Sequence, residues 1–277
     1  MSKNPSPNLP RNRFQEFKYI ASLWDRMLSI SLLVALFALP LAAILTVSAV
    51  VEASLLQQVT NEAEQMAALL QLRVFTGLIS LVGFYPLTLG LSGAFYFMRR
   101  TVWSQGATIK SDFFKGVRGG LVACIIPTLF AMLTFLFLET SLWFVPLLFP
   151  QIVWKIAMYV VVGLVVVLMF SVIMYDLCQN AVYQVSTFHR LKNSFIFAFV
   201  KYPRNLLVAL VTFVPFVPMF MWRILGMVIA FTAMAVYCFA LCTLGQTLYC
   251  HSVFDKYINA KEYPELVNKG LAKEEKQ

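Results

Sequence analysis

Long apolar runs alternate with short polar connections along this chain, and this pattern sets the expected architecture. A helix needs about 20 mostly apolar residues to cross a hydrocarbon core about 30 Å thick, because each residue rises about 1.5 Å. Six runs are long enough, so the pattern predicts an all-α, polytopic membrane protein with about six transmembrane helices. They cover about residues 27–51, 74–98, 121–139, 152–175, 206–222 and 224–250.

The fifth run, "LLVALVTFVPFVPMFMW", is the weakest of the six. It is short, and Pro215 and Pro218 cannot donate the backbone hydrogen bonds of a continuous helix. We expect this segment to kink, or only just to reach the far side of the bilayer.

Composition supports the membrane assignment. The 277 residues are 60% hydrophobic and only 13% charged, whereas an ordinary soluble domain has roughly 25% charged residues. The five cysteines lie in or beside apolar runs, which is typical of small buried residues and gives no disulfide framework. The net charge is +9, but the basic residues cluster at the ends of apolar runs. A nucleic-acid-binding protein gathers them on a soluble face instead, so we expect a lipid bilayer and no nucleic acid as partner.

Lys and Arg are distributed unequally between the two sides of the predicted helices. Of the 22 such residues, all except Arg73, Lys155 and Arg223 lie in the two tails or in the connections 99–120 and 176–205. Basic residues of short loops stay in the cytoplasm, which predicts that both termini are cytoplasmic. The first apolar run is longer than that of a signal peptide, so we expect it to remain uncleaved. The expected organisation is a cytoplasmic N-terminal amphipathic segment (1–26), a six-helix transmembrane domain (27–250) and a cytoplasmic C-terminal tail (251–277).

Two connections on the opposite side differ in kind. Residues 52–73 hold three glutamates among strong helix formers, and we expect them to extend the first helical hairpin beyond the bilayer. Residues 139–151, "ETSLWFVPLLFPQ", carry the aromatic side chains typical of a membrane surface.

Two cytoplasmic connections have the pattern of short basic amphipathic helices. They are "IKSDFFKGVRGGL" and "STFHRLKNSFIFAFVKYPRNLL", and Pro203 interrupts the second before the next apolar run. Such segments bind an anionic leaflet or dock a partner protein, and amphipathicity alone does not distinguish the two. The residues expected to dock a partner or the membrane surface are Phe113, Phe114, Lys115, Arg118, Phe195, Phe199 and Lys201.

The sequence offers no catalytic, cofactor-binding or metal-binding constellation. His189 and His251 lie in different connections, and Cys238 and Cys242 are typical packing residues of an apolar helix. Phosphate-loop, nucleophile-elbow and zinc-protease motifs are absent. None of the six apolar runs carries a charge at mid-depth, which disfavours ion-coupled transport. We therefore expect a protein that is not an enzyme and needs no cofactor.

Small residues gather in the second predicted helix, in "YPLTLGLSGAFYFMRR". Gly90, Ser92, Gly93 and Ala94 would let neighbouring helices approach closely, which is how membrane helices associate. We expect a tightly packed inner helix that bends at Pro86, with Pro86, Gly90 and Gly93 as its packing residues.

Five short stretches, taken in order, resemble the YesL-like family of bacterial membrane proteins, also called the domain of unknown function 624 family. They are "FALP" (37–40), "YPLTLGLSGAFYFMRR" (85–100), "SDFFKGVRGGL", "RLKNSFIFAFVKYPRNLL" and "HSVFDKYI" (251–258), and the similarity runs from about residue 14 to 260. The chain departs from the family in the segment 52–73, because the family joins its first two helices tightly. The resemblance implies a bacterial inner-membrane protein that is often encoded beside genes for carbohydrate uptake.

Two functions follow as expectations. The first is a non-enzymatic accessory or scaffold subunit, whose implied partners are the subunits of an ABC-type sugar transporter. The second is a permease or substrate-binding membrane component that transports a small solute itself, along neutral polar groups such as Thr46, Thr88 and Gln246. The loop through which ABC permeases engage their ATPase is not recognisable here, since "KGVRGGLVACIIP" shares only glycines and a proline with it.

Overall fold

A computed structural model describes residues 10, 12–59, 61–183 and 185–271, and for residues 219–224 it describes the backbone alone. The described residues are 89% helical and contain no strand. Five helices are long and apolar enough to cross a membrane, and a bent pair raises the number to six. These findings confirm the expected all-α, polytopic architecture.

Four of the long helices come first in the chain: α2 (Trp24–Gln58), α3 (Glu62–Val102), α5 (Ile125–Leu148) and α6 (Ile152–Val182). The fifth is a continuous helical stretch, Leu225–Glu262. It comprises the end of α9 (Val217–Ala233), the π-helix η2 (Met234–Cys238), α10 (Phe239–Phe254), the π-helix η3 (Asp255–Asn259) and α11 (Ala260–Glu262). The shorter elements are α1 (Arg13–Ala21), α4 (Ile109–Gly120), α7 (Thr187–Val200), α8 (Tyr202–Phe213) and the 3-10 helices η1 (Val214–Phe216) and η4 (Pro264–Leu266).

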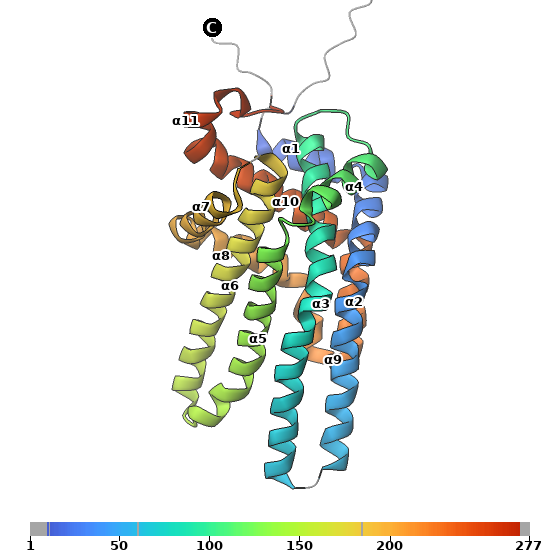
Figure 1. Cartoon of the computed structure of the whole chain (residues 1–277), viewed down its shortest axis with the longest axis vertical. Helices are drawn as coiled ribbons and strands as arrows, with labels where there is room; N and C mark the ends of the chain where they lie inside the picture. Colours follow the sequence, from blue (N-terminus) through green and yellow to red (C-terminus); the bar gives the residue numbers. More distant parts are fainter. Residues whose placement is uncertain (1–9, 11, 60, 184, 272–277) are drawn as a thin grey trace, which may run out of the picture.

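Helices α1, α4, α7 and α11 gather at one end of the bundle, which we call the terminal end (Figure 1). Helix α3 lies at the centre of the molecule and contacts α2, α4, α5, α6 and α10. The largest fully buried side chains of the core come from these central elements and include Phe95, Phe97, Met98, Leu177 and Phe254. The core is therefore densest where the short helices close the terminal end.

The α2–α3 hairpin reaches further from the terminal end than the α5–α6 hairpin does (Figure 1). Segment 52–73 is helical on both sides of its turn, as the sequence predicts, and the side chain of Asn61 caps α3 by accepting from the backbone N–H of Ala63 at 3.0 Å. Arg73 of α3 forms ion pairs with Glu52 of α2 at 3.1 Å and with Glu139 of α5 at 2.6 Å. One arginine thus ties three helices together on this side.

The sequence predicts a surface connection over residues 139–151, but most of these residues belong to helix α5. The helix runs through Pro146 to Leu148, and only residues 149–151 link it to α6. Pro146 lies in the last turn. Membrane helices tolerate such a proline because neighbouring groups satisfy the backbone carbonyl that it leaves free.

The fifth predicted helix is not continuous over 206–222. Helix α8 ends at Phe213, a 3-10 turn follows, and α9 starts with Pro218 in its first turn. Twelve residues of α8 rise about 18 Å, which is short of the hydrocarbon core. Helices α7 and α8 meet at 93°, with Pro203 in the first turn of α8, so α7 lies across the bundle while α8 enters it.

Candidate functional site

A buried ion pair fixes α7 to the terminal end of α6. Arg190 Nε lies 2.8 Å from Asp176 Oδ1, and both side chains are almost fully buried. The guanidinium also donates to Asn180 Oδ1 at 2.9 Å and to the carbonyl oxygen of Ala123 at 3.0 Å. From the sequence, Arg190 belongs to the basic residues of a cytoplasmic connection. In the structure it pairs with Asp176 inside the protein, so it is not available to lipid or protein partners.

A second network ties α1 to the C-terminal segment. Arg13 pairs with Glu16 at 2.9 Å and with Asp255 at 3.0 Å. Asn259 donates to Asp255 Oδ1 at 2.7 Å and accepts from the hydroxyl of Tyr183 at 2.6 Å. Burial raises the pKa of the Glu16 carboxyl above its ordinary value, and the neighbouring Arg13 opposes that shift. Residues 251–271 therefore pack onto the bundle.

The expected docking residues of α4 divide into a buried and an exposed group. Phe113 is fully buried, and its ring lies 5.9 Å from that of Phe37, so the expectation that it docks a partner is wrong. Phe114 is 41% exposed, and Lys115 and Arg118 are exposed beside it. Phe113 and Phe114 are neighbours on a helix, and only one of them can face α2 and α3.

The expected docking residues of α7 divide in the same way. Phe195 is half-buried, and its ring packs edge-on against Phe130 of α5 at 5.7 Å. Phe199 is 62% exposed. Lys201 ends the helix with its Nζ 4.9 Å from the centre of the Tyr257 ring. The structure does not merge α4 and α7 into one surface, since they lie on either side of the end of α5 in Figure 1.

The basic residues at the terminal end differ in whether they pair with a carboxylate of this chain. Arg13, Arg100 and Arg190 are each engaged by a carboxylate of this chain. Within the described ranges, Lys115 and Arg118 form no ion pair, and the nearest aromatic partner is Tyr96, 5.9 Å from Lys115 Nζ. The side chain of Arg223, one of the three basic residues expected on the opposite side, lies outside the described residues.

The small residues of α3 lie at close helix contacts. A Cβ atom added at Gly93 would lie 2.9 Å from the carbonyl oxygen of Phe113, and one at Gly90 would lie 2.7 Å from Cβ of Phe37. Both are shorter than ordinary van der Waals contacts, so glycine is required by the approach of α4 and α2. Helix α3 continues unbroken through Pro86, which is half-buried.

A cavity of about 220 Å³ lies inside the bundle, between α3, α5, α6 and the broken α8–η1 segment. Its wall includes Phe84 and Leu91 of α3, Phe170 of α6, Phe213 of α8 and Phe239 of α10. The hydropathy pattern predicts helices but not the gaps between them. Of the neutral polar groups that the sequence suggests for a solute path, Thr88 and Gln246 line this cavity and Thr46 does not.

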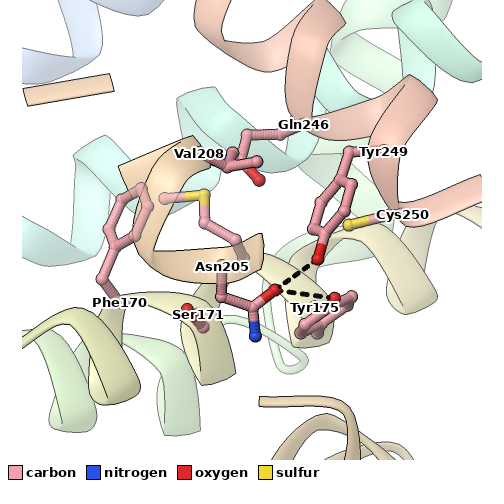
Figure 2. Close-up of a pocket in the computed structure, with 9 residues that line it drawn as sticks. Phe170, Ser171, Tyr175, Asn205, Val208, Gln246, Tyr249 and Cys250 are labelled. Carbon is pink, nitrogen blue, oxygen red and sulfur yellow. Dashed lines mark hydrogen bonds between the residues drawn. The ribbon is translucent and has the colours of Figure 1, made fainter. Parts of the chain in front are cut away.

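A polar cluster adjoins the cavity, since Phe170, Met174 and Gln246 line both. Figure 2 shows its centre, where Asn205 lies between Tyr175 and Tyr249. Asn205 of α8 accepts from the hydroxyl of Tyr175 at 3.0 Å and from that of Tyr249 at 2.7 Å. Its amide nitrogen donates to the carbonyl oxygens of Phe197 and Ala198 at the end of α7. The adjoining void measures about 10 Å³, which is at the lower limit for one water molecule. These hydrogen bonds of Asn205 therefore hold the start of α8 against the end of α7 and against α6 and α10.

Within the part of the chain that is described, no three His, Cys, Asp or Glu side chains come together as metal ligands would. His189 bonds through Nδ1 to Ser186 Oγ at 2.7 Å, and the buried His251 lies against Trp103. Comparisons of this chain with protein-family models, with curated proteins and with solved structures found no match.

Proposed function

We propose that this chain is a non-enzymatic accessory subunit of a membrane complex and docks its partner at the terminal end. The docking residues are Phe114, Lys115 and Arg118 of α4, which are all exposed. The observation that carries the proposal is that Lys115 and Arg118 are exposed beside the exposed ring of Phe114 and form no ion pair within the described residues, whereas Arg13, Arg100 and Arg190 are each paired. Exposed basic and aromatic side chains at one spot suit an acidic, partly apolar protein surface.

The terminal end faces the cytoplasm in this proposal. Basic residues of short loops concentrate there, and such residues resist transfer across a membrane. The resemblance to the YesL-like family adds the bacterial inner membrane as the location and the subunits of an ABC-type carbohydrate importer as the partner.

The alternative function, transport of a small solute by this chain, rests on the cavity. Its wall is mainly apolar and aromatic, with three threonines and Gln246 as its polar side chains, and no charged residue is among those that line it in the described structure. A sugar or an ion would lose its hydrogen bonds to water there without gaining equivalent ones. The cavity therefore favours the accessory role over transport of a polar solute.

The test is a charge reversal on α4, Lys115→Glu with Arg118→Glu. Both side chains are exposed, so we expect normal membrane insertion and an unchanged melting temperature. The matched control is Lys256→Glu with Lys261→Glu, which makes the same charge change at two other exposed positions of the terminal end. Partners are measured by crosslinking in native membranes followed by quantitative mass spectrometry.

Docking predicts at least a tenfold loss of importer subunits from the α4 variant and slower growth on a complex carbohydrate, with the control like wild type. Leaflet contact alone predicts a smaller effect, because each basic residue near an anionic surface contributes about 1 kcal/mol and the long helices anchor the protein anyway. If the α4 variant keeps every partner and grows normally, the docking proposal is wrong.

A further inference from the structure

We propose that the cavity in the bundle holds part of one acyl chain of a membrane phospholipid. This inference is independent of the docking proposal, because it concerns the membrane-embedded part of the chain and not the terminal end. It rests on how the cavity is formed, on what its wall offers, on its size and on where it opens.

Irregular helix geometry forms the cavity. The chain breaks after Phe213 into a 3-10 turn, and Phe213 before that turn and Phe216 at its end contribute to the wall. Opposite them, Met234 lies in the π-helix η2 and Phe239 directly follows it. Two regular helices would pack against α3 and α6 along their length, whereas these interruptions hold the backbone away and leave space. Single-turn π segments of this kind are frequent at functional sites.

The polar side chains of the wall are turned toward the protein itself. Thr88 bonds to Thr128 Oγ1 at 2.7 Å, and Thr243 donates to the carbonyl oxygen of Phe239 at 2.8 Å. Thr212 donates to the carbonyl oxygen of Val208 at 2.9 Å and accepts from Gln246 Nε2 at 3.3 Å. Because these groups already have partners, the cavity gives water little to bind, and an apolar occupant is favoured.

Size and access point to a lipid chain. An apolar cavity of about 150 Å³ holds a benzene molecule, and this one measures about 220 Å³. Phe84, Leu91, Phe170 and Phe213 in its wall are half-buried, so the cavity opens between helices to the outside of the bundle. All four residues lie in the predicted membrane-crossing runs, where the surroundings are the acyl chains of the bilayer. The nearest and most abundant occupant is therefore a phospholipid tail.

The test fills the cavity and counts bound lipids. Ala131→Trp and Cys242→Phe each place a ring in the space from a different wall, α5 and α10. Ala157→Trp is the matched control, since Ala157 is exposed on α6 and does not line the cavity. Native mass spectrometry of protein purified in mild detergent measures the number and the mass of lipids on each chain.

We expect one phospholipid on the wild type and on Ala157→Trp, and at least a tenfold lower occupancy on the two filling variants. A wild type without bound phospholipid overturns the proposal. So does a bound free fatty acid in its place, or an unchanged occupancy in filling variants that melt like wild type.

A second measurement uses only the wild-type protein, so it does not depend on whether a variant folds. Cys242 lines the cavity, whereas Cys238, also half-buried, lies outside it and serves as internal reference. Phospholipid added to the delipidated wild-type protein should slow the alkylation of Cys242 by N-ethylmaleimide several-fold and leave Cys238 unaffected. Equal rates at Cys242 with and without phospholipid contradict an acyl chain in the cavity.

Discussion

At the scale of single residues, the contact between α3 and α4 depends on glycines that face one another. A Cβ atom added at Gly116 would lie 2.9 Å from Cα of Gly93, and one at Gly120 would lie 2.7 Å from Oγ of Ser92. The backbones approach so closely here that neither helix can carry a side chain without moving the other. Close packing of small residues is the main attraction between helices in a membrane, so these positions hold the fold together.

Gly93→Leu should destabilise the protein far more than Gly163→Leu. At Gly93 the new side chain meets the backbone of Phe113, which cannot move without shifting α4, whereas nothing lies within 4 Å of a Cβ atom at Gly163. Overpacking of a tight contact costs typically about 1–3 kcal/mol. Thermal unfolding in detergent measures the difference, and equal melting temperatures of the two variants would contradict this packing.

Arg190→Leu should be among the most damaging single changes at the terminal end. It leaves the carboxylate of Asp176 buried without its ion-pair partner, and the loss of one partner from a buried pair costs about 3–5 kcal/mol. The double variant Arg190→Leu with Asp176→Leu removes both charges and should regain much of the lost stability. If the double variant unfolds at a lower temperature than the single one, the ion pair is not what Arg190 contributes.

The sequence predicts some of these residues and misses others for identifiable reasons. Gly90 and Gly93 stand out because small residues recur within one stretch of an apolar helix. The burial of Phe113 instead of Phe114 depends on the rotation of α4, which a pattern with phenylalanine at both positions does not fix. The pairing of Asp176 with Arg190 depends on how α7 folds back over α6, and this is a tertiary arrangement that periodicity does not contain.

At the scale of elements, hydropathy locates the long helices but not the irregular ones. The predicted runs 27–51 and 152–175 lie within α2 and α6. Helix α2 extends further because the residues that follow its run are mostly good helix formers. Helix α6 extends further because most of its last residues are buried at the terminal end. The run 206–222 is divided into α8, a 3-10 turn and α9 at the prolines that mark it as weak in the sequence. The π-helix η2 within 224–250 leaves no signal, because a π segment has the same composition as an α-helix.

Asn205→Leu should loosen the corner between α7 and α8. The change keeps a similar size but removes two hydrogen bonds to the end of α7 and leaves the hydroxyls of Tyr175 and Tyr249 without an acceptor. With each hydrogen bond worth about 0.5–1.5 kcal/mol, we expect a loss of about 2–4 kcal/mol. Asn193→Leu on α7 is the control, since within the described chain its side chain makes no hydrogen bond. Hydrogen exchange of α7 amides should rise in the first variant only.

At the scale of the whole molecule, the two ends of the bundle have different character. The terminal end carries the short helices and two internal ion-pair networks, centred on Arg13 and Arg190. The opposite end consists of two helical hairpins of unequal length, held together by Arg73 (Figure 1). The segment Thr187–Phe216 leads from the terminal end into the bundle. The chain then returns to the terminal end through α9 and α10.

This asymmetry makes the orientation of the chain in the membrane the most direct test of the account. Single cysteines are placed at exposed positions, Asn61→Cys at the hairpin turn and Lys110→Cys and Lys192→Cys on α4 and α7, and are labelled with a membrane-impermeant maleimide. The wild type, whose five cysteines are buried or half-buried, gives the background. We predict that intact cells label Asn61→Cys alone, and that inverted membrane vesicles label the two lysine positions but not Asn61→Cys. Labelling of Lys192→Cys in intact cells would contradict the shared cytoplasmic face on which the docking proposal depends.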